Sequence, residues 1–287
     1  MRSDRSVERF ALLLLLLVNV YIRFTGIGDF SLSNDELSAV TRLEVSTFTE
    51  LIENGVIATD PHPAGTQVFL YYWTSVFGTS PFAIRFPFVV FGILGFFFLY
   101  ATFRRWIGFQ RAVLAISFIS LLEFIIIHGQ LARPYALGFF STTVFVWAWD
   151  RFALAGDKKT WIKIAYVLSA VLSCYAHYFA GLFAGIVALT GLIVVYKKGQ
   201  FRPFLWMNLA VMALFIPHVS VTIAQLSRTT LTAWIPPPES DFISTHIFIL
   251  LNRSVFLLVL FLALSLWSLL RFIAVERDKA QYLLFGA

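Results

Sequence analysis

The stretch IRFPFVVFGILGFFFLYATF, residues 84–103, contains a single charged residue before its end, Arg85. A helix of about 20 mostly apolar residues crosses the roughly 30 Å hydrocarbon core of a bilayer. The rest of the chain has a similar composition, since 59% of its 287 residues are hydrophobic and only 13% are charged. A soluble domain cannot bury that much apolar surface. The sequence therefore predicts an all-α polytopic membrane protein.

Seven further apolar runs are long enough to be crossings, near residues 9–27, 111–128, 136–151, 161–178, 180–196, 203–222 and 248–270. The first follows basic residues but precedes no small-residue cleavage site, as in a retained signal anchor. A ninth stretch, AGTQVFLYYWTSVFG at 64–78, would be only about 22 Å long as a helix and is rich in interfacial aromatic residues. We expect this stretch to lie along the interface.

The distribution of Lys and Arg supports eight crossings. If 64–78 does not cross, 16 of the 22 basic residues fall on one side, in five segments around residues 2–9, 104–111, 151–163, 197–202 and 271–279. The positive-inside rule makes that side, with the N-terminus, cytoplasmic. The net charge of +6 is then topological and implies no nucleic-acid partner. We find no linker or repeat and expect one membrane domain over 1–287, with residues 28–83 as the first outer loop.

Two adjacent carboxylates, Asp35 and Glu36, follow the first crossing. The segment Ser33-Asn34-Asp35-Glu36 fits a capping box, with Ser33 as the N-cap and Glu36 at the third helical position. A cap does not explain Asp35, whose negative charge would be favoured by the helix dipole. Asp35 therefore has two interpretations, neighbour of a cap or catalytic group.

Other polar residues are predicted on the same outer face. TDPHPAG (59–65) contains Asp60 and His62, and HGQLARPYALG (128–138) contains Arg133 and Tyr135. Pro134 suits a first helical turn. Arg133 and Arg85 either snorkel to the interface or bind a phosphate by charge-assisted hydrogen bonds. Accessory positions are Asp60, His128, Gln130, His177, Tyr178 and Glu123. Glu123 lies within an apolar run, where pairing with an Arg would also accommodate it.

Several function classes lack support. There is no P-loop, HExxH, CxxC set, GxSxG or dinucleotide fingerprint. The single cysteine, Cys174, excludes an internal disulfide. WIPPPESDF (234–242) is predicted to be a Pro-stiffened outer loop that could act as a lid.

In this order, the polar motifs resemble those of the GT-C superfamily of integral-membrane glycosyltransferases. The similar branch groups dolichyl-phosphate-mannose-protein mannosyltransferases with aminoarabinose and galacturonic-acid transferases of bacterial envelopes. The resemblance covers residues 30–245 and rests on Asp35-Glu36, DPHPAG, Arg85-Phe86-Pro87, GQLARPYAL, YAHYF and WIPPP. It implies two juxtamembrane helices in the first outer loop and, since members generally continue further, an incomplete or unusually short chain.

The resemblance also implies an activity. A sugar would pass, with inversion, from a polyprenyl-phosphate donor to a lipid, glycan or protein acceptor on the outer face of a bacterial inner membrane. Asp35 would be the catalytic base and Glu36 its helper, while Arg85, Arg133, Tyr135 and His62 would bind the donor phosphate. No cofactor is assigned. A divalent metal on Asp35 and Glu36 stays open, because some relatives use one and others do not.

Two other classes stay open. A transporter or lipid flippase would show inverted repeats and broken helices with polar residues near the midplane. A non-catalytic membrane subunit would tolerate Asp35→Asn, which a catalyst would not.

Overall fold

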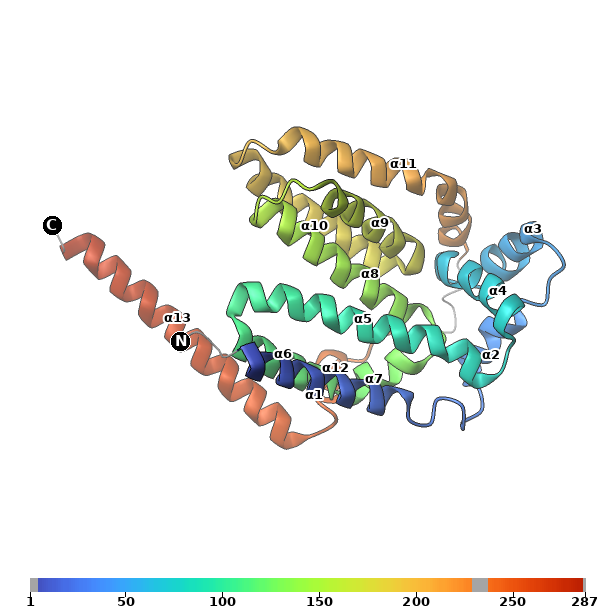
Figure 1. Ribbon diagram of the computed structural model, residues 1–287, viewed down its shortest axis with the longest axis horizontal. Coiled ribbons are helices and arrows are strands. Elements are labelled where there is room, and N and C mark those ends of the chain that lie inside the picture. Colours follow the sequence, from blue (N-terminus) through green and yellow to red (C-terminus); the bar gives the residue numbers. More distant parts are fainter. Residues whose placement is uncertain (1–4, 229–236, 286–287) are drawn as a thin grey trace. The chain divides into compact units, whose positions relative to one another are not determined.

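The computed structural model describes residues 5–228 and 237–285, and every regular element in these ranges is a helix (Figure 1). This confirms the all-α class. In chain order the helices are α1 (Arg5–Phe24), α2 (Asn34–Thr41), α3 (Phe48–Glu50), the π-helix η1 (Leu51–Ile57), α4 (Gly65–Phe77), α5 (Pro81–Ile107), α6 (Phe109–Ser120), α7 (Glu123–Gln130), α8 (Pro134–Trp149), the π-helix η2 (Asp150–Leu154), α9 (Thr160–Ala176), α10 (Tyr178–Lys197), α11 (Phe201–Leu226), α12 (Phe242–Leu250) and α13 (Val255–Phe285).

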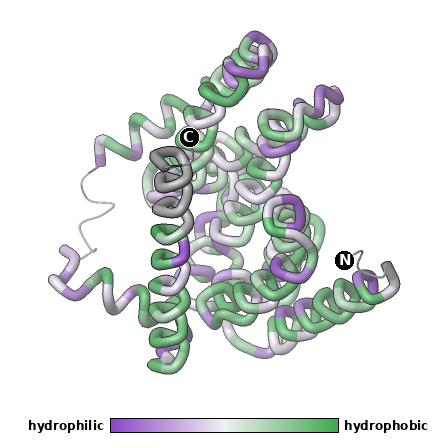
Figure 2. Tube along the Cα trace, turned by 90° about the vertical axis from the view of Figure 1, so that its left-hand side faces the viewer, coloured by the Kyte–Doolittle hydropathy of each residue, from purple (hydrophilic) through white to green (hydrophobic). Residues whose placement is uncertain are grey.

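Four helices are long and apolar enough to cross a membrane: α5, α10, α11 and the first 20 residues of α13. Hydrophobic residues run along most of the helical length (Figure 2). The pair α6 and α7, bent by 68°, adds a fifth span if it crosses as one broken helix. Of the other expected crossings, α8 and α9 have only 16 and 17 residues, and α1 carries four charged residues. The chain is thus a multi-pass membrane protein, and eight crossings stay a prediction.

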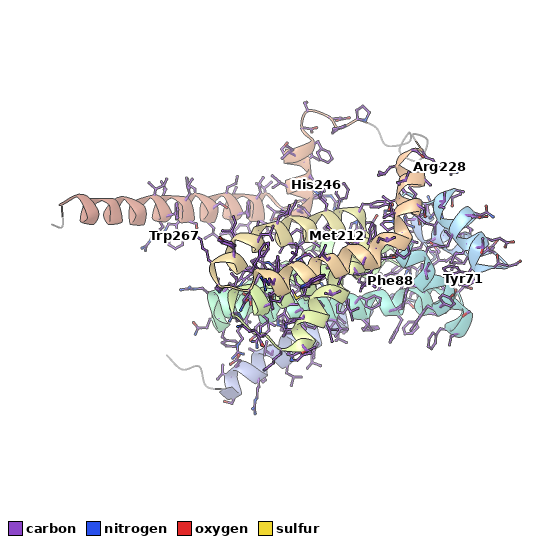
Figure 3. The ribbon with its side chains drawn as sticks, turned by 90° about the horizontal axis from the view of Figure 1, so that it is seen from above. Tyr71, Phe88, Met212, Arg228, His246 and Trp267 are labelled. Carbon is purple, nitrogen blue, oxygen red and sulfur yellow. The ribbon has the colours of Figure 1, made fainter. Side chains whose placement is uncertain are left out.

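The ambiguous stretch 64–78 forms α4, which has 13 residues and is therefore about 20 Å long. A helix of this length is too short to span the hydrocarbon core. It lies with α2, α3 and η1 beyond one end of α5 and α11 (Figure 1). We call this end of the bundle the outer end after the predicted orientation, which stays a prediction. At the same end Arg228, close to the last turn of α11 (Figure 3), donates a hydrogen bond of 2.7 Å to the Ala58 carbonyl.

The chain divides into two compact units. The first comprises residues 1–121 and 125–236, and the second comprises residues 122–124 and 237–287. The core of the first unit lies among α8, α9, α10 and α11, where Phe145, Tyr166 and Phe204 pack with less than 2% exposure. Small residues let large rings approach. A Cβ added to Gly95 of α5 would lie 2.6 Å from the ring of Phe139 on α8.

Charged side chains pair at the opposite end of the first unit. Nε of Arg104, near the end of α5, lies 2.7 Å from Oε1 of Glu8 on α1. Arg105 pairs with Asp150 at the start of η2, and Lys198 donates to the carbonyls of Ala153 and Leu154. Basic side chains from two segments of this unit therefore lie at one end, and the topology predicted from the sequence expects the same grouping. That this end is cytoplasmic stays a prediction.

The break between α6 and α7 is held by a buried arginine of α1. Arg23 is fully buried, and its Nη2 donates to the Ser120 carbonyl at 3.0 Å. This carbonyl belongs to the last turn of α6, where no further helical N–H can reach it. Nη1 donates to Asn19, and the guanidinium lies 4.7 Å above the ring of Phe96. Arg23 thus donates a hydrogen bond to a carbonyl that has no helical partner at the end of α6.

The second unit contains α12 and α13 together with the first residues of α7. Asn252 and Arg253, in the turn before α13, have φ of 58° and 52°. Such left-handed conformations are uncommon for residues other than glycine. The Glu123 N–H donates to the Asn252 side chain, and the Arg253 guanidinium lies 3.1 Å from the Glu123 carboxylate. Trp267 is 60% exposed on α13 (Figure 3), where apolar side chains cover the helix surface.

Candidate active site

Glu36 and Arg85 form a buried ion pair near the outer end of the bundle. The capping box is confirmed: the Ser33 hydroxyl accepts from the Glu36 N–H, and the Glu36 carboxylate accepts from the Ser33 N–H. The same carboxylate accepts from Nε and Nη2 of Arg85, both at 2.8 Å, and from the Ala132 N–H at 3.0 Å. Burial alone would raise the pKa of Glu36. The hydrogen bonds from Arg85, Ala132 and Ser33 outweigh it and hold this pKa below its ordinary value.

The remaining donors of Arg85 are also used. Nη1 donates to the carbonyls of Ile27 and Phe30, and Nη2 to that of Ser31, all within 3.0 Å. With the two bonds to Glu36, all five N–H groups of this guanidinium have partners. Arg85 therefore fastens the chain after α1 to α2, rather than offering donors to a phosphate as the sequence suggested. Glu36 likewise has a structural role in this arrangement.

Asp35 differs from Glu36 in its exposure and in its hydrogen-bond partners. It is exposed in the first turn of α2, and its carboxylate makes no hydrogen bond or ion pair within the described residues. Asp35, Ser38 and Arg42 are spaced i, i+3, i+7 and lie along one face of α2. Asp35 is close enough to Arg42 to stabilise its positive charge. The exposed carboxylate of Asp35 therefore lies near the guanidinium of Arg42 without a hydrogen bond or ion pair between them.

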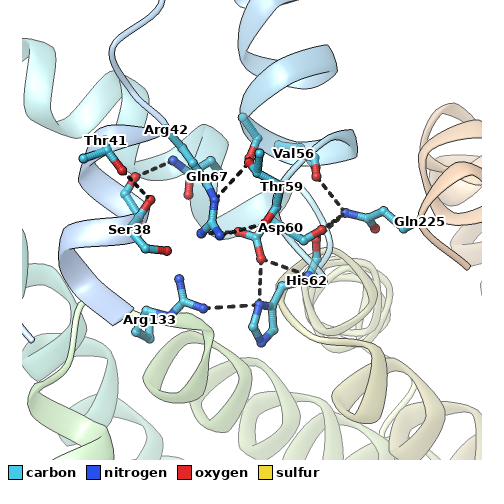
Figure 4. A network of polar contacts seen from close by, with 12 residues as sticks. Ser38, Thr41, Arg42, Val56, Thr59, Asp60, His62, Gln67, Arg133 and Gln225 are labelled. Carbon is cyan, nitrogen blue, oxygen red and sulfur yellow. Dashed lines mark hydrogen bonds and ion pairs between the residues drawn. The ribbon is translucent and has the colours of Figure 1, made fainter. Parts of the chain in front are cut away.

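Arg42 belongs to a group of charged and titratable side chains that we call the polar cluster. Its members are Arg42, Asp60, His62, Arg133 and His177, and Figure 4 shows the first four. Arg42 donates to the Thr59 hydroxyl and carbonyl, and its Nη1 lies 3.4 Å from Oδ2 of Asp60. Oδ1 of Asp60 accepts from the His62 N–H at 3.0 Å and lies 2.7 Å from His62 Nδ1. Burial would raise the pKa of Asp60, but His62, Arg42 and Arg133 together lower it. Asp60 is therefore a carboxylate, and His62 Nδ1 carries the proton that it accepts.

Arg133 lacks any comparable partner. Its side chain lies at the start of α8 and is only 5% exposed, and within the described residues it forms no ion pair and its Nε no hydrogen bond. Nη2 lies 3.4 Å from His62 Nδ1. That nitrogen already donates to Asp60, so it cannot also accept from Arg133. A buried charge is normally paired, because its desolvation is otherwise uncompensated. Arg133, at a helix N-terminus, is therefore suited to an anionic ligand.

A row of rings lies next to Arg133. The centroids of His62 and His177 are 5.2 Å apart, those of His177 and Tyr135 6.4 Å, and those of Tyr135 and His128 4.8 Å. His177 Nδ1 accepts the Phe179 N–H and caps α10. Burial, followed by the charges of His62 and Arg133, lowers the pKa of His177 to about 4. His177 is therefore neutral near pH 7.

Three of the accessory residues have structural partners. The Tyr178 hydroxyl donates to Gln225, and Gln225 in turn donates to the carbonyls of Asp60 and His62. Gln130 donates to the Ile22 and Arg23 carbonyls at the end of α1. Glu123 pairs with Arg253 in the second unit, as the alternative interpretation of its position suggested.

Arg42 and Gln225 organise the TDPHPAG turn, although neither was predicted from the sequence. A signal existed for Arg42, because it follows Asp35 by seven residues and shares its helical face. No sequence signal pointed to Gln225, because it comes 163 residues after His62.

A metal site on the two adjacent carboxylates is not supported by their geometry. Within the described residues, no group of three or more His, Cys, Asp or Glu side chains could hold a metal ion. Asp35 and Glu36 do not form a joint metal pair here, because Glu36 is buried and fully engaged. The residues 234–236 of the expected lid lie outside the described ranges.

Comparison with models of known protein families found no match to this chain. Comparison with curated protein sequences found none either.

Proposed function

We propose that the chain is an integral-membrane glycosyltransferase that takes a sugar from a polyprenyl-phosphate donor. The observation that carries this proposal is the buried guanidinium of Arg133, which forms no direct ion pair in the described residues and whose Nε has no hydrogen bond, although the Asp60 carboxylate is close enough to interact with its charge. It lies at the outer end of an apolar bundle, beside His62 and the start of α8. A lipid-linked phosphate diffuses in the membrane plane and would supply a directly hydrogen-bonded anion at this depth.

The proposed reaction uses the exposed carboxylate of Asp35 and the buried guanidinium of Arg133. The acceptor hydroxyl attacks the anomeric carbon while its proton passes to the exposed carboxylate of Asp35. The bond between the anomeric carbon and the phosphate oxygen breaks, the configuration inverts, and polyprenyl phosphate leaves. Arg133 and the N–H groups of the first turn of α8 stabilise the charge that develops on the leaving group. Asp60 orients His62 next to this site through a bond to Nδ1.

A transporter or lipid flippase is the second candidate, because one observation favours it. Helices α6 and α7 form a bent pair, and a buried cation, Arg23, lies at the break. Broken helices of this kind form substrate sites in transporters. Arg23 donates to Asn19 and to the free Ser120 carbonyl, so its position already has a structural reason. A fluorescent-lipid scrambling assay in proteoliposomes separates the two candidates, since a glycosyltransferase should not move lipid between leaflets.

The donor proposal is tested by lipid binding. Purified full chain in nanodiscs is offered undecaprenyl phosphate or undecaprenol, and retention is measured by native mass spectrometry. Wild type should retain the phosphate at least tenfold better. Arg133→Ala should lose this preference, and Arg133→Lys should weaken it, because lysine keeps the charge but not the planar fork.

Arg202→Lys is the matched control, since Arg202 is exposed at the start of α11, far along that helix from the outer end. Equal retention of both lipids by wild type, or an unchanged preference in Arg133→Ala, would contradict the proposal. Mass spectrometry of envelope glycolipids and glycans, with and without the gene, then tests transfer itself. Identical profiles would count against glycosyl transfer.

A further inference from the structure

A second candidate site shares Arg42 with the polar cluster. A cavity of about 440 Å³, open to solvent over much of its surface, lies between the last turn of α2 and η1, and six of its eight lining residues have polar or charged side chains. Pockets for small molecules have volumes of roughly 300–1,000 Å³. Gly55 brings the two backbones together, because a Cβ there would lie 2.9 Å from the Arg42 carbonyl. We call this space the α2–η1 cavity.

The lining contains groups without partners. The side chains of Glu44 and Asn54, both exposed to solvent, and the half-buried Ser38 hydroxyl form no hydrogen bond with the protein within the described residues. Arg42 uses three of its five N–H groups on Thr59 and Asp60, which leaves two. The wall from Leu51 to Ile57 is a π-helix, a rare element that is frequent at functional sites. The cavity therefore offers both donors and acceptors to a ligand.

The charges in the lining indicate which class of ligand the cavity can bind. The positive charge of Arg42 is already paired with Asp60. Glu44 adds a negative charge to the lining, and this charge has no ion-pair partner in the described residues. An anionic headgroup would be repelled by Glu44. An apolar group would strip water from the carboxylate, the amide and the hydroxyl without replacing their hydrogen bonds. A neutral molecule with many hydroxyls can give and take hydrogen bonds with all of them.

The cavity also lies where an acceptor is needed. Ser38, which lines it, follows Asp35 by one helical turn on the same face of α2. Arg42 lines the cavity and also contacts Asp60 of the polar cluster. We propose that the α2–η1 cavity binds the acceptor as a neutral glycan headgroup and presents one of its hydroxyls to Asp35. This inference rests on the proposed function and names the substrate class that the site accepts.

The test is binding of the full chain, in nanodiscs, to an array that carries neutral glycans, phosphorylated glycans, carboxylated glycans and Ser/Thr peptides. Wild type should bind neutral glycans preferentially. Asn54→Leu and Glu44→Gln should each weaken this binding at least tenfold. Glu53→Gln is the matched control, because Glu53 is an exposed neighbour on η1 that does not line the cavity. It should stay within twofold of wild type.

Binding of undecaprenyl phosphate is measured on the same preparations. Absence of neutral-glycan binding, preference for anionic glycans or peptides, or unchanged binding in both cavity variants would overturn the inference. If that happens while lipid-phosphate binding still depends on Arg133, the proposed donor site stands alone. If glycans bind through Asn54 but the lipid phosphate does not bind, the donor proposal fails and the glycan site remains. Unchanged melting temperatures show that the variants are folded.

Discussion

Glu36→Gln should destabilise the protein strongly, although glutamine has nearly the same shape as glutamate. The native carboxylate accepts two bonds from Arg85 and one N–H each from Ala132 and Ser33. Glutamine has one acceptor oxygen and would turn its NH₂ group toward another donor. Arg85, only 6% exposed, would then carry an uncompensated positive charge.

Removing one partner of a buried ion pair costs about 3–5 kcal/mol. For a chain of this size each kcal/mol corresponds to roughly 2–4 °C in melting temperature, so the expected drop is on the order of 10 °C. The adjacent Asp35→Asn is the matched control. Surface changes usually alter stability by less than about 0.5 kcal/mol, so its melting temperature should stay within about 2 °C of wild type.

The assay combines thermal unfolding in detergent with sugar transfer from a polyprenyl-phosphate donor. Asp35→Asn should keep its stability and lose roughly a hundred- to ten-thousand-fold in transfer rate, the usual effect of removing a general base. A double variant, Glu36→Leu with Arg85→Leu, should be more stable than either single one, because it leaves no buried charge unpaired. The reasoning is refuted if Glu36→Gln melts like wild type, or if Asp35→Asn transfers sugar within about threefold of wild type.

Three further predictions concern topology, packing and pH. In a background without the native cysteine, Thr79→Cys and Gln110→Cys flank α5 and should label from opposite sides of the membrane; labelling from one side would contradict the assignment of α5 as a crossing. Gly95→Ala places a Cβ 2.6 Å from a Phe139 ring atom and should cost about 1–3 kcal/mol in thermal unfolding, whereas Gly185→Ala in α10 meets nothing within 4 Å and should be neutral or stabilising. The pKa of His177 is about 4 in the folded protein and about 6.5 in the unfolded chain. Between these two pH values the unfolded state binds more protons than the folded state. The melting temperature should therefore fall as the pH drops from about 6.5 to 4. His177→Asn keeps an acceptor for the Phe179 N–H but does not titrate, so an unchanged pH profile in this variant would exclude His177 as the cause.

Local patterns in the sequence predicted the features that depend on near neighbours. The apolar run at 84–103 predicted a long membrane helix, and α5 extends over Pro81–Ile107. Ser33 and Glu36 predicted a capping box, which requires only residues three apart. The helix at 64–78 and the start of α8 at Pro134 follow for the same reason. The two π-helices carried no such signal, since their hydrogen bonds depend on how the chain packs.

Partners far apart in the chain were decided by tertiary structure alone. Arg85 and Arg133 are indistinguishable in the sequence, since both stand at the start of an apolar helix. Arg85 meets Glu36 across 49 residues and uses every donor, whereas within the described residues Arg133 forms no direct ion pair and its nearest polar contact is a histidine nitrogen that cannot accept from it. Asp35 and Glu36 are neighbours that point to opposite environments, one exposed and one buried. Whether a charged side chain fastens the fold or is left for a ligand depends on the groups that the fold brings within about 4 Å of it, because electrostatic and hydrogen-bond energies fall steeply with distance.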